Sequence, residues 1–256
     1  MIANYHTHTY RCHHARGFEW QYVQNAAEGG LKILGFSDHI PNPFERFDHL
    51  GVRMRCRQLP EYIKTVRQLK EQFKEQMTIH CGLEAEYHPK RFPKQLELMD
   101  EAGGVDYLLL GQHFIINEDG SYTDCTLPFG EEQRLASYVD QVLEGLSTGK
   151  FLYLCHPDIV HFTGDESVYR KQMRRLCQEA KRMDIPLELN GQGLRTKRIY
   201  PRPLFWELAA EEGNLGVIGT DAHSPWVAYD PQEVEALSAI AQKYHIPILE
   251  TLEDRL

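Results

Sequence analysis

The sequence lacks the features that would place the protein in a membrane or outside the cell. Its 256 residues contain no apolar run near the roughly 20 residues that span a bilayer. The N-terminus does not have the basic and then apolar layout of a secretory signal. The six cysteines are scattered and form no CxxC pair, which favours free thiols over a disulfide framework. We therefore expect a cytoplasmic protein without membrane contact.

An excess of basic residues is also missing. The chain has 28 Lys and Arg against 37 Asp and Glu, a net charge of -9, which disfavours nucleic-acid binding. A small anionic substrate is compatible with this charge, because a bound metal ion can override it locally. A content of 42% hydrophobic and 25% charged residues is typical of a globular protein, for which we expect a monomer or a small homo-oligomer.

Several common functional motifs are absent. The chain has neither a GxGxxG nor a Walker-type loop, which disfavours a dinucleotide or nucleoside triphosphate site, and no GxSxG, which disfavours an esterase. No low-complexity segment or Pro/Ser-rich linker divides it. We therefore expect a single domain over residues 1–256.

The chain instead alternates short apolar runs with longer amphipathic segments. The seven runs, each of about strand length, are IANYHTH, KILGFSDH, TIHCGLEAE, VDYLLLGQH, FLYLCHPD, PLELNGQ and NLGVIGTDAH. Segments such as 59–76, 131–149, 167–184 and 202–213 carry apolar residues at helical spacing. The tail 231–256 is also helix-like, and we expect it to pack on the domain. Such alternation predicts an α/β fold with a parallel sheet.

Polar side chains that can bind metals recur at the ends of these runs. The residues at these ends are His6, His8, His39, Glu84, His113, His156, Asn190, Asp221 and His223. Functional groups gather at the C-terminal mouth of βα barrels, whereas an open sheet concentrates them at one switch point. We therefore predict a closed, seven-stranded (β/α)7 barrel with a metal site at this mouth.

The mixture of imidazoles and carboxylates indicates which ions could bind. His6 and His8 are two residues apart on a strand, so both side chains should point to the same face. Such ligands suit Zn, Fe or Mn rather than Ca. Because a tetrahedral site takes four ligands, this number of candidates implies two to three divalent ions. Cys12 and Cys155, each beside a histidine, we interpret as small buried residues rather than ligands.

The motifs HTH, SDH, GLEAEYHP, GQH, CHPD and GTDAH occur in this order between about residues 4 and 230. This series resembles the PHP (polymerase and histidinol phosphatase) phosphoesterases. The resemblance implies a distorted seven-stranded TIM-like barrel with up to three metal ions. Three groups of ligands would follow from it: His6, His8, Glu84 and Asp221; Glu84, His113 and His156; and His14, His39 and His223. His13 would stand where relatives commonly have glycine, and would not be a ligand.

Within this family the sequence is most similar to the histidinol-phosphatases, through VRMRCRQLPEY, GLEAEYHP and LELNGQGLRTKRIYPRP. This resemblance implies metal-dependent hydrolysis of L-histidinol phosphate in histidine biosynthesis. Arg195 matches a position expected to contact the phosphate, and Arg53 is a second candidate. His161 stands where a basic Arg or Lys is common and could donate to the phosphate. Asp221 and His223 would handle the proton that passes to the leaving alkoxide.

Other functions remain open on the sequence alone. Another PHP phosphoesterase could act on a phosphotyrosine protein, a sugar phosphate or a nucleotide. A TIM-barrel amidohydrolase also uses an early HxH pair and a late Asp, but it usually carries a bridging lysine or carboxylate at its fourth strand, where this chain has His113. A metal-binding module without catalysis is disfavoured by the completeness of the ligand set.

Overall fold

The computed structural model describes residues 1–43, 51–117 and 121–256. Seven parallel strands form one sheet in the order β1 (Ala3–Asn4), β2 (Ile33–His39), β3 (Thr78–Ala85), β4 (Tyr107–Leu110), β7 (Tyr153–Leu154), β8 (Leu187–Asn190) and β9 (Gly216–Gly219). Except for the β5–β6 hairpin, strand order follows chain order, as is typical of a βα barrel. The predicted seven-stranded βα architecture is confirmed.

The two ends of this sheet meet, so that the barrel is nearly closed. Thr7 forms an isolated parallel bridge with Ala222, and the His8 N–H donates to the Ala222 carbonyl at 2.9 Å. Below this bridge, Asn4 Nδ2 donates to Thr220 Oγ1 at 2.8 Å, and the Thr220 N–H donates to Asn4 Oδ1 at 3.1 Å. The Asn4 side chain therefore replaces part of the backbone hydrogen bonding that would join the two end strands, β1 and β9. β1 and β7 are shorter than the predicted runs.

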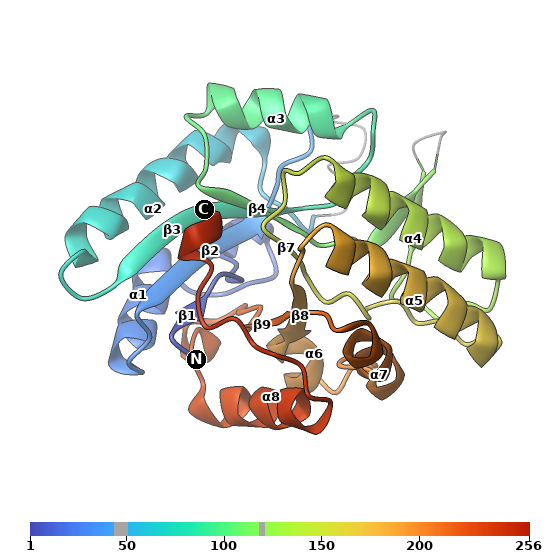
Figure 1. Cartoon of the computed structure of the whole chain (residues 1–256). Helices are drawn as coiled ribbons and strands as arrows, with labels where there is room; N and C mark the ends of the chain where they lie inside the picture. Colours follow the sequence, from blue (N-terminus) through green and yellow to red (C-terminus); the bar gives the residue numbers. More distant parts are fainter. Residues whose placement is uncertain (44–50, 118–120) are drawn as a thin grey trace.

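Helices surround the ring of strands, as Figure 1 shows. They are α1 (Glu19–Glu28), α2 (Leu59–Phe73), α3 (Phe92–Glu101), α4 (Glu132–Ser147), α5 (Glu166–Arg182), α6 (Gly191–Arg195), α7 (Pro203–Glu212) and α8 (Pro231–Lys243). Two of them begin at aspartate N-caps, Asp165 and Asp230, which accept backbone N–H groups. Proline in the first turn also starts α2, α7 and α8. None of the helices in the described segments is both long and apolar enough to cross a membrane.

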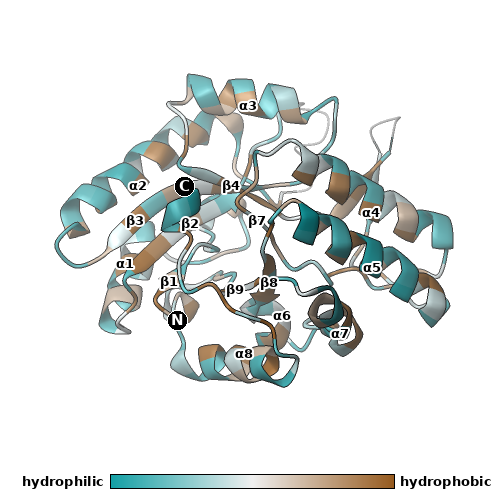
Figure 2. Ribbon diagram, viewed as in Figure 1, coloured by the Kyte–Doolittle hydropathy of each residue, from teal (hydrophilic) through white to brown (hydrophobic). Residues whose placement is uncertain are grey.

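The core has two parts, because successive side chains along a strand point to opposite faces of the sheet. In β4, Leu108 and Leu110 belong to the large cluster between the strands and the helices, whereas Tyr107 and Leu109 belong to a smaller cluster. The smaller cluster joins residues from around the ring and includes Leu252 of the C-terminal tail. Figure 2 shows apolar strands at the centre and hydrophilic outer helix faces. The tail therefore packs on the barrel, as predicted.

One element was not predicted from the sequence. A two-stranded antiparallel hairpin, β5 (Phe114–Ile116) and β6 (Tyr122–Asp124), lies between β4 and α4. Its strands contain three residues each and carry no long apolar run. Short runs of aromatic and β-branched residues were the available signal. The hairpin follows His113 directly, and this position brings it to the mouth of the barrel.

Candidate metal centre and active site

The residues predicted at the strand ends converge in space. Glu84 lies in β3, and His39 ends β2, while His156 and Asp221 follow β7 and β9. Histidines 6 and 8 follow β1 on either side of the bridging Thr7, so both rings face the same cluster. The side chains of His6, His8, Glu84 and His156 are no more than 1% exposed. Parallel strands that end at one mouth account for this convergence.

Glu84 occupies the centre of the cluster. One carboxylate oxygen, Oε1, lies 3.0 Å from His156 Nε2 and 3.6 Å from His113 Nε2. The other oxygen, Oε2, lies 3.0 Å from His39 Nδ1 and 3.4 Å from His8 Nε2. Glu84 therefore faces two groups of imidazoles, one with each oxygen, as a bridging ligand does.

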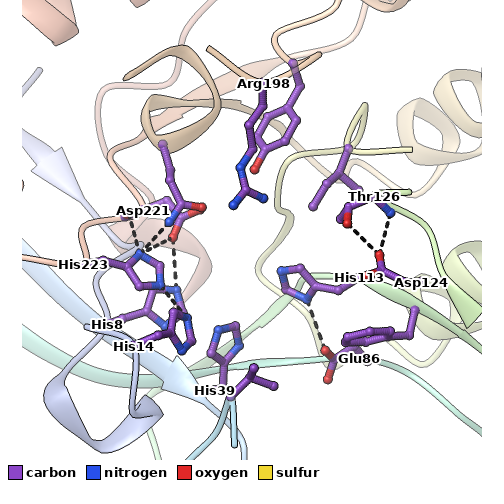
Figure 3. A pocket seen from close by; sticks show the side chains of 15 residues that line it. His8, His14, His39, Glu86, His113, Asp124, Thr126, Arg198, Asp221 and His223 are labelled. Carbon is purple, nitrogen blue, oxygen red and sulfur yellow. Dashed lines mark hydrogen bonds and ion pairs between the residues drawn. The ribbon is translucent and has the colours of Figure 1, made fainter. Parts of the chain in front are cut away.

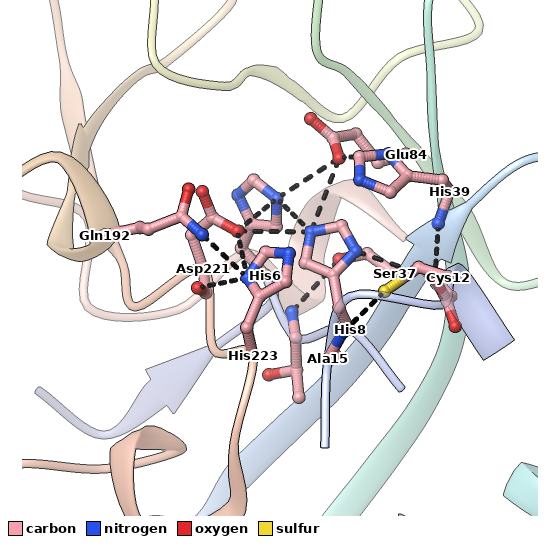
Figure 4. A network of polar contacts seen from close by, with 12 residues as sticks. His6, His8, Cys12, Ala15, Ser37, His39, Glu84, Gln192, Asp221 and His223 are labelled. Atoms are coloured by element: carbon pink, nitrogen blue, oxygen red, sulfur yellow. Dashed lines mark hydrogen bonds and ion pairs between the residues drawn. The ribbon is translucent and has the colours of Figure 1, made fainter. Parts of the chain in front are cut away.

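Asp221 completes the group around the HTH pair (Figure 4). Its Oδ1 atom lies 3.1 Å from His8 Nε2 and 3.6 Å from His6 Nε2. Asn190 Nδ2 donates to the other oxygen at 3.1 Å and so orients the carboxylate. Asp221 has φ +48° and His156 has φ +26°, conformations that cost a non-glycine residue about 1–3 kcal/mol. Such strain at two members of the cluster is typical of a functional site.

His14 and His223 form the third group. Their Nε2 atoms are 2.9 Å apart, and His39 lies beside them, with a ring centroid 5.4 Å from that of His14. His14 is exposed at the rim, and the neighbouring His13 is also exposed and has φ +68°, the left-handed conformation that favours glycine. The backbone at position 13 is therefore that of the glycine position to which the resemblance assigned it.

The electrostatics of the cluster match those of metal ligands. Burial disfavours charge on Glu84 and Asp221, but the surrounding histidines outweigh this and hold the pKa of both carboxyls well below their usual range. Burial lowers the pKa of His39 to about 4 and that of His223 well below its usual value. For His8, the carboxylates of Asp221 and Asp38 outweigh burial and raise the pKa to about 9. A cation that binds here therefore displaces a proton from His8.

The orientation of the imidazoles shows that the residues fit divalent cations. Nδ1 of His6 contacts Glu188 Oε1 at 2.7 Å, and Nδ1 of His14 contacts the Cys12 carbonyl at 2.8 Å. These contacts direct Nε2 of His6 toward Nε2 of His8, 3.2 Å away, and Nε2 of His14 toward Nε2 of His223, 2.9 Å away. Among the described residues, Glu84 Oε2 and Asp221 Oδ1 are buried without a hydrogen-bond donor. These imidazole nitrogens and carboxylate oxygens could together hold divalent cations.

Two cysteines lie beside the cluster. Sets of possible ligand atoms within 4.8 Å of one another include Cys155 with His6 and Glu188, and Cys12 with His14 and His223. Burial raises the pKa of both thiols, Cys155 well above its usual value, and this opposes the thiolate form that binds metals. Both side chains are fully buried, which agrees with their interpretation as small buried residues.

A cavity of about 160 Å³ opens above the cluster (Figure 3). The cluster residues that line it are His8, His14, His39, His113, Asp221 and His223. Arg198 lies on one side, and Asp124 and Thr126 of the hairpin region lie on another. Tyr200 and Phe114 also line the cavity. The cavity therefore joins the candidate metal ligands to polar and aromatic groups that could contact a small ligand.

The structure places the three predicted phosphate-contacting residues outside the lining of this cavity. Arg195 forms a partly buried ion pair with Glu233 and donates to the carbonyls of Thr220 and Asp221. Arg53 forms a two-pronged ion pair with Glu86, with N–O distances of 2.8 and 3.2 Å. His161 lines an adjoining hollow with Lys197 and Arg198.

Sequence reasoning missed several residues of the site. Among the described residues, Arg198 is the arginine that lines the cavity, three residues beyond Arg195. Glu188 and Asp38 contact His6 and His8 from behind, and Asp124 faces the cavity from the hairpin. For Glu188 and Asp38, the signal was their position inside otherwise apolar strand runs, where an unpartnered carboxylate is costly.

The fold and the donor set define a βα barrel with a candidate metal centre at its C-terminal mouth. The PHP domain model matches residues 4–192, and the chain belongs to the PHP domain family.

Individual relatives share a name. A Deinococcus radiodurans protein named probable histidinol-phosphatase is 29% identical over 232 residues, which cover 88% of this chain and 87% of the relative. The Bacillus subtilis histidinol-phosphatase is 29% identical over 250 residues, covering 85% and 92%. The crystal structure of a Lactococcus lactis histidinol phosphate phosphatase, complexed with zinc, L-histidinol and phosphate, superposes with a TM-score of 0.71 at 18% identity, covering 97% of this chain and 95% of that one.

Proposed function

We propose that the protein is a metal-dependent phosphoric monoester hydrolase that converts L-histidinol phosphate into L-histidinol and phosphate. The observation that carries this proposal is the convergence of facing imidazole nitrogens and two anionic carboxylates beneath a cavity that Arg198 enters. The names of the relatives support the choice of substrate. The scattered cysteines support a cytoplasmic location as part of the same proposal.

The metal centre in this proposal holds two to three divalent ions, Zn, Fe or Mn. The groups that would hold them are His6, His8, Glu84 and Asp221; Glu84, His113 and His156; and His14, His39 and His223. When bound, such ions neutralise charge on phosphoryl oxygens and lower the pKa of water from 15.7 to roughly 7. The zinc complex of the Lactococcus lactis enzyme supports this choice of cofactor for a protein of the same fold.

Arg198 takes the role of phosphate contact in this proposal, in place of Arg195 and Arg53. Its guanidinium projects into the cavity, and an arginine fork matches phosphate oxygens with two parallel hydrogen bonds. Arg195 instead holds the backbone of Thr220 and Asp221, and so positions the aspartate. His161 in the adjoining hollow adds positive potential near Arg198 when it is protonated.

Proton transfer to the leaving alkoxide is assigned to the pair Asp221 and His223. His223 Nδ1 lies 3.4 Å from Asp221 Oδ1, and both side chains line the cavity. Gln192 Nε2 lies 3.0 Å from His223 Nδ1 and fixes the orientation of the ring. A group that passes a proton must be within hydrogen-bond reach of the reacting oxygen, and this pair is positioned beside the cavity floor.

The rates of phosphate release from three substrates test the proposal. Purified, metal-loaded protein is assayed with L-histidinol phosphate, a phosphotyrosine peptide and a sugar phosphate. We expect kcat/KM to be highest for L-histidinol phosphate. A preference for either other substrate, or no release from L-histidinol phosphate, contradicts the proposed function. The variants Glu84→Ala and His156→Ala should lose both metal content and activity, and unchanged values in both would contradict the metal centre.

A further inference from the structure

The β5–β6 hairpin places an aromatic ring and a carboxylate side by side at the cavity. Phe114 and Asp124 are directly opposite each other in the antiparallel pair, and both line the cavity. Directly opposed residues in such a pair project from the same face, with Cβ atoms about 5 Å apart. The hairpin therefore presents an apolar surface next to an anionic group.

The backbone around Asp124 is held from several directions. Arg134 Nη2 donates to the Asp124 carbonyl at 2.5 Å, and the Cys125 N–H donates to the His113 carbonyl at 3.0 Å. One carboxylate oxygen, Oδ1, accepts the Thr126 N–H at 2.8 Å and the Thr126 hydroxyl at 2.6 Å. The other oxygen accepts no hydrogen bond from the described residues, so it can accept one from a ligand. The carboxylate is thus oriented before anything binds.

Asp124 differs from the other carboxylates of the cavity in its charge balance. Glu86 is paired with Arg53 and with His113, whose Nδ1 lies 3.1 Å away, and Asp221 lies within the histidine cluster. In the described part of the chain, no Lys, Arg or His nitrogen lies within 4.0 Å of the Asp124 carboxylate. Among the described residues, its negative charge therefore has no cationic side chain in an ion pair with it.

The positive group of the cavity lies elsewhere. Arg198 projects into the cavity from the segment after α6 and is separate from Asp124 of the hairpin, as Figure 3 shows. A molecule that lies across the cavity would meet a cationic and metal-binding region at one end and an anionic one at the other. Complementary charges select a ligand with an anionic phosphate at one end and a cation at the other.

We infer that Asp124 is a specificity residue that binds the ammonium group of the substrate, while Phe114 contacts its ring. The class of substrate is a phosphate monoester of an amino alcohol that carries an aromatic or heteroaromatic ring. This inference rests on the proposed function and assigns the part of the substrate that does not react. The carboxylate contributes to binding, and the chemical step leaves it unchanged.

The test compares two substrates on wild type and Asp124→Asn. One substrate is L-histidinol phosphate, and the other is imidazolylpropyl phosphate, the analogue without the amino group. In Asp124→Asn, the side-chain amide keeps an oxygen that can accept the hydrogen bonds from Thr126, but it carries no charge. We expect kcat/KM for L-histidinol phosphate to fall about 10- to 100-fold, mainly through KM, because a hydrogen bond between charged groups is lost. For the analogue, kcat/KM should change less than about threefold between the two proteins, within the range of a neutral surface substitution.

Matched variants separate recognition from a structural effect. Asp254→Asn removes an exposed aspartate in the C-terminal tail and should leave both substrates unchanged. Asp124→Glu keeps the charge and should recover part of the loss. An equal fall for both substrates, or no change for either, overturns the inference and leaves the proposed function standing. A metal-loaded wild type that hydrolyses p-nitrophenyl phosphate but neither test substrate contradicts the proposed function, and this inference with it.

Discussion

Glu188 Oε1 accepts a hydrogen bond from His6 Nδ1 at 2.7 Å, in the fully buried interior of the barrel. The other oxygen accepts the His156 N–H at 2.9 Å and Asn190 Nδ2 at 2.8 Å. One carboxylate therefore positions members of two predicted ligand groups. Its contact with His6 fixes the ring tautomer and directs Nε2 toward Glu84 and Asp221.

Glu188→Gln should weaken metal binding without abolishing the fold. The glutamine amide keeps one acceptor oxygen. Its NH2 group would face N–H donors that a carboxylate oxygen of Glu188 accepts in the wild type. Loss of such a supporting contact typically lowers metal affinity about 10- to 100-fold. Titration of the metal-free protein with zinc measures the affinity, and circular dichroism serves as the control. Wild-type affinity in a folded variant would contradict the positioning role.

Removal of the metal should lower stability as well as activity. The Nε2 atoms of His14 and His223 lie 2.9 Å apart, and those of His6 and His8 lie 3.2 Å apart, so bound cations would hold these side chains together. Ligand binding to the folded state contributes about 2.7 kcal/mol when the free ligand is 100-fold above its Kd. Thermal unfolding before and after treatment with a chelator measures this difference. An unchanged Tm, and activity that survives chelation, would count against a metal centre.

Arg198 and Arg195 should give different kinetic defects. Arg198→Ala should raise KM for the phosphate ester about 10- to 100-fold, because it removes a charged hydrogen-bond donor. Arg195→Ala leaves the buried Glu233 without its partner and should lower the free energy of unfolding by about 1–3 kcal/mol. Urea unfolding and steady-state kinetics on both variants separate the two effects. The opposite pattern would indicate that Arg195, and not Arg198, contacts the phosphate.

The adjacent histidines at positions 13 and 14 provide a matched pair. His13 is exposed and left-handed, so His13→Gly should raise the free energy of unfolding by about 0.5–1 kcal/mol. It should leave metal content unchanged. His14→Ala, one residue further on, should lower metal content because its Nε2 faces His223. Metal analysis that shows the reverse order would overturn the assignment of His14.

Asp106, at the other end of the barrel, should control part of the acid sensitivity. Partial burial opposes its charge, but His80 and the Cys81 N–H, 2.9 Å from Oδ2, outweigh this and lower its pKa to about 2. Because this pKa lies below the ordinary value of 3.8, the stabilisation is complete above that value and is lost as the pH falls toward 2. In chelator, Asp106→Asn should therefore lose less stability than wild type between about pH 7 and about pH 3, as measured by urea unfolding. Equal losses would contradict this contribution.

The sequence predicted the barrel and the convergence of the strand-end residues because both depend on strong local signals. Buried parallel strands such as β4 are continuous apolar runs, and a histidine or carboxylate at the end of such a run is conspicuous. The sequence could not show that Arg198, and not Arg195, lines the cavity. The α6 helix ends at Arg195, and Lys197 has φ +54°, so the direction of the next side chains depends on a turn rather than on a helical period.

The hairpin was missed for a related reason. Its three-residue strands have little pattern of their own, and their place at the cavity depends on long-range contacts such as the His161 N–H with the Cys125 carbonyl, at 2.8 Å. Periodicity reports which face of an element is buried, but not which loop covers the mouth of the barrel. The single-domain organisation over residues 1–256 stays a prediction.

Anomalous diffraction at the zinc, iron and manganese edges, from crystals soaked in inorganic phosphate, tests the central claim most directly. We predict two or three anomalous peaks enclosed by the three ligand groups, with Glu84 between two of them. Phosphate should lie against these ions and within hydrogen-bond distance of the Arg198 guanidinium. The absence of anomalous peaks in crystals of active protein, or phosphate bound away from the histidine cluster, would contradict the account.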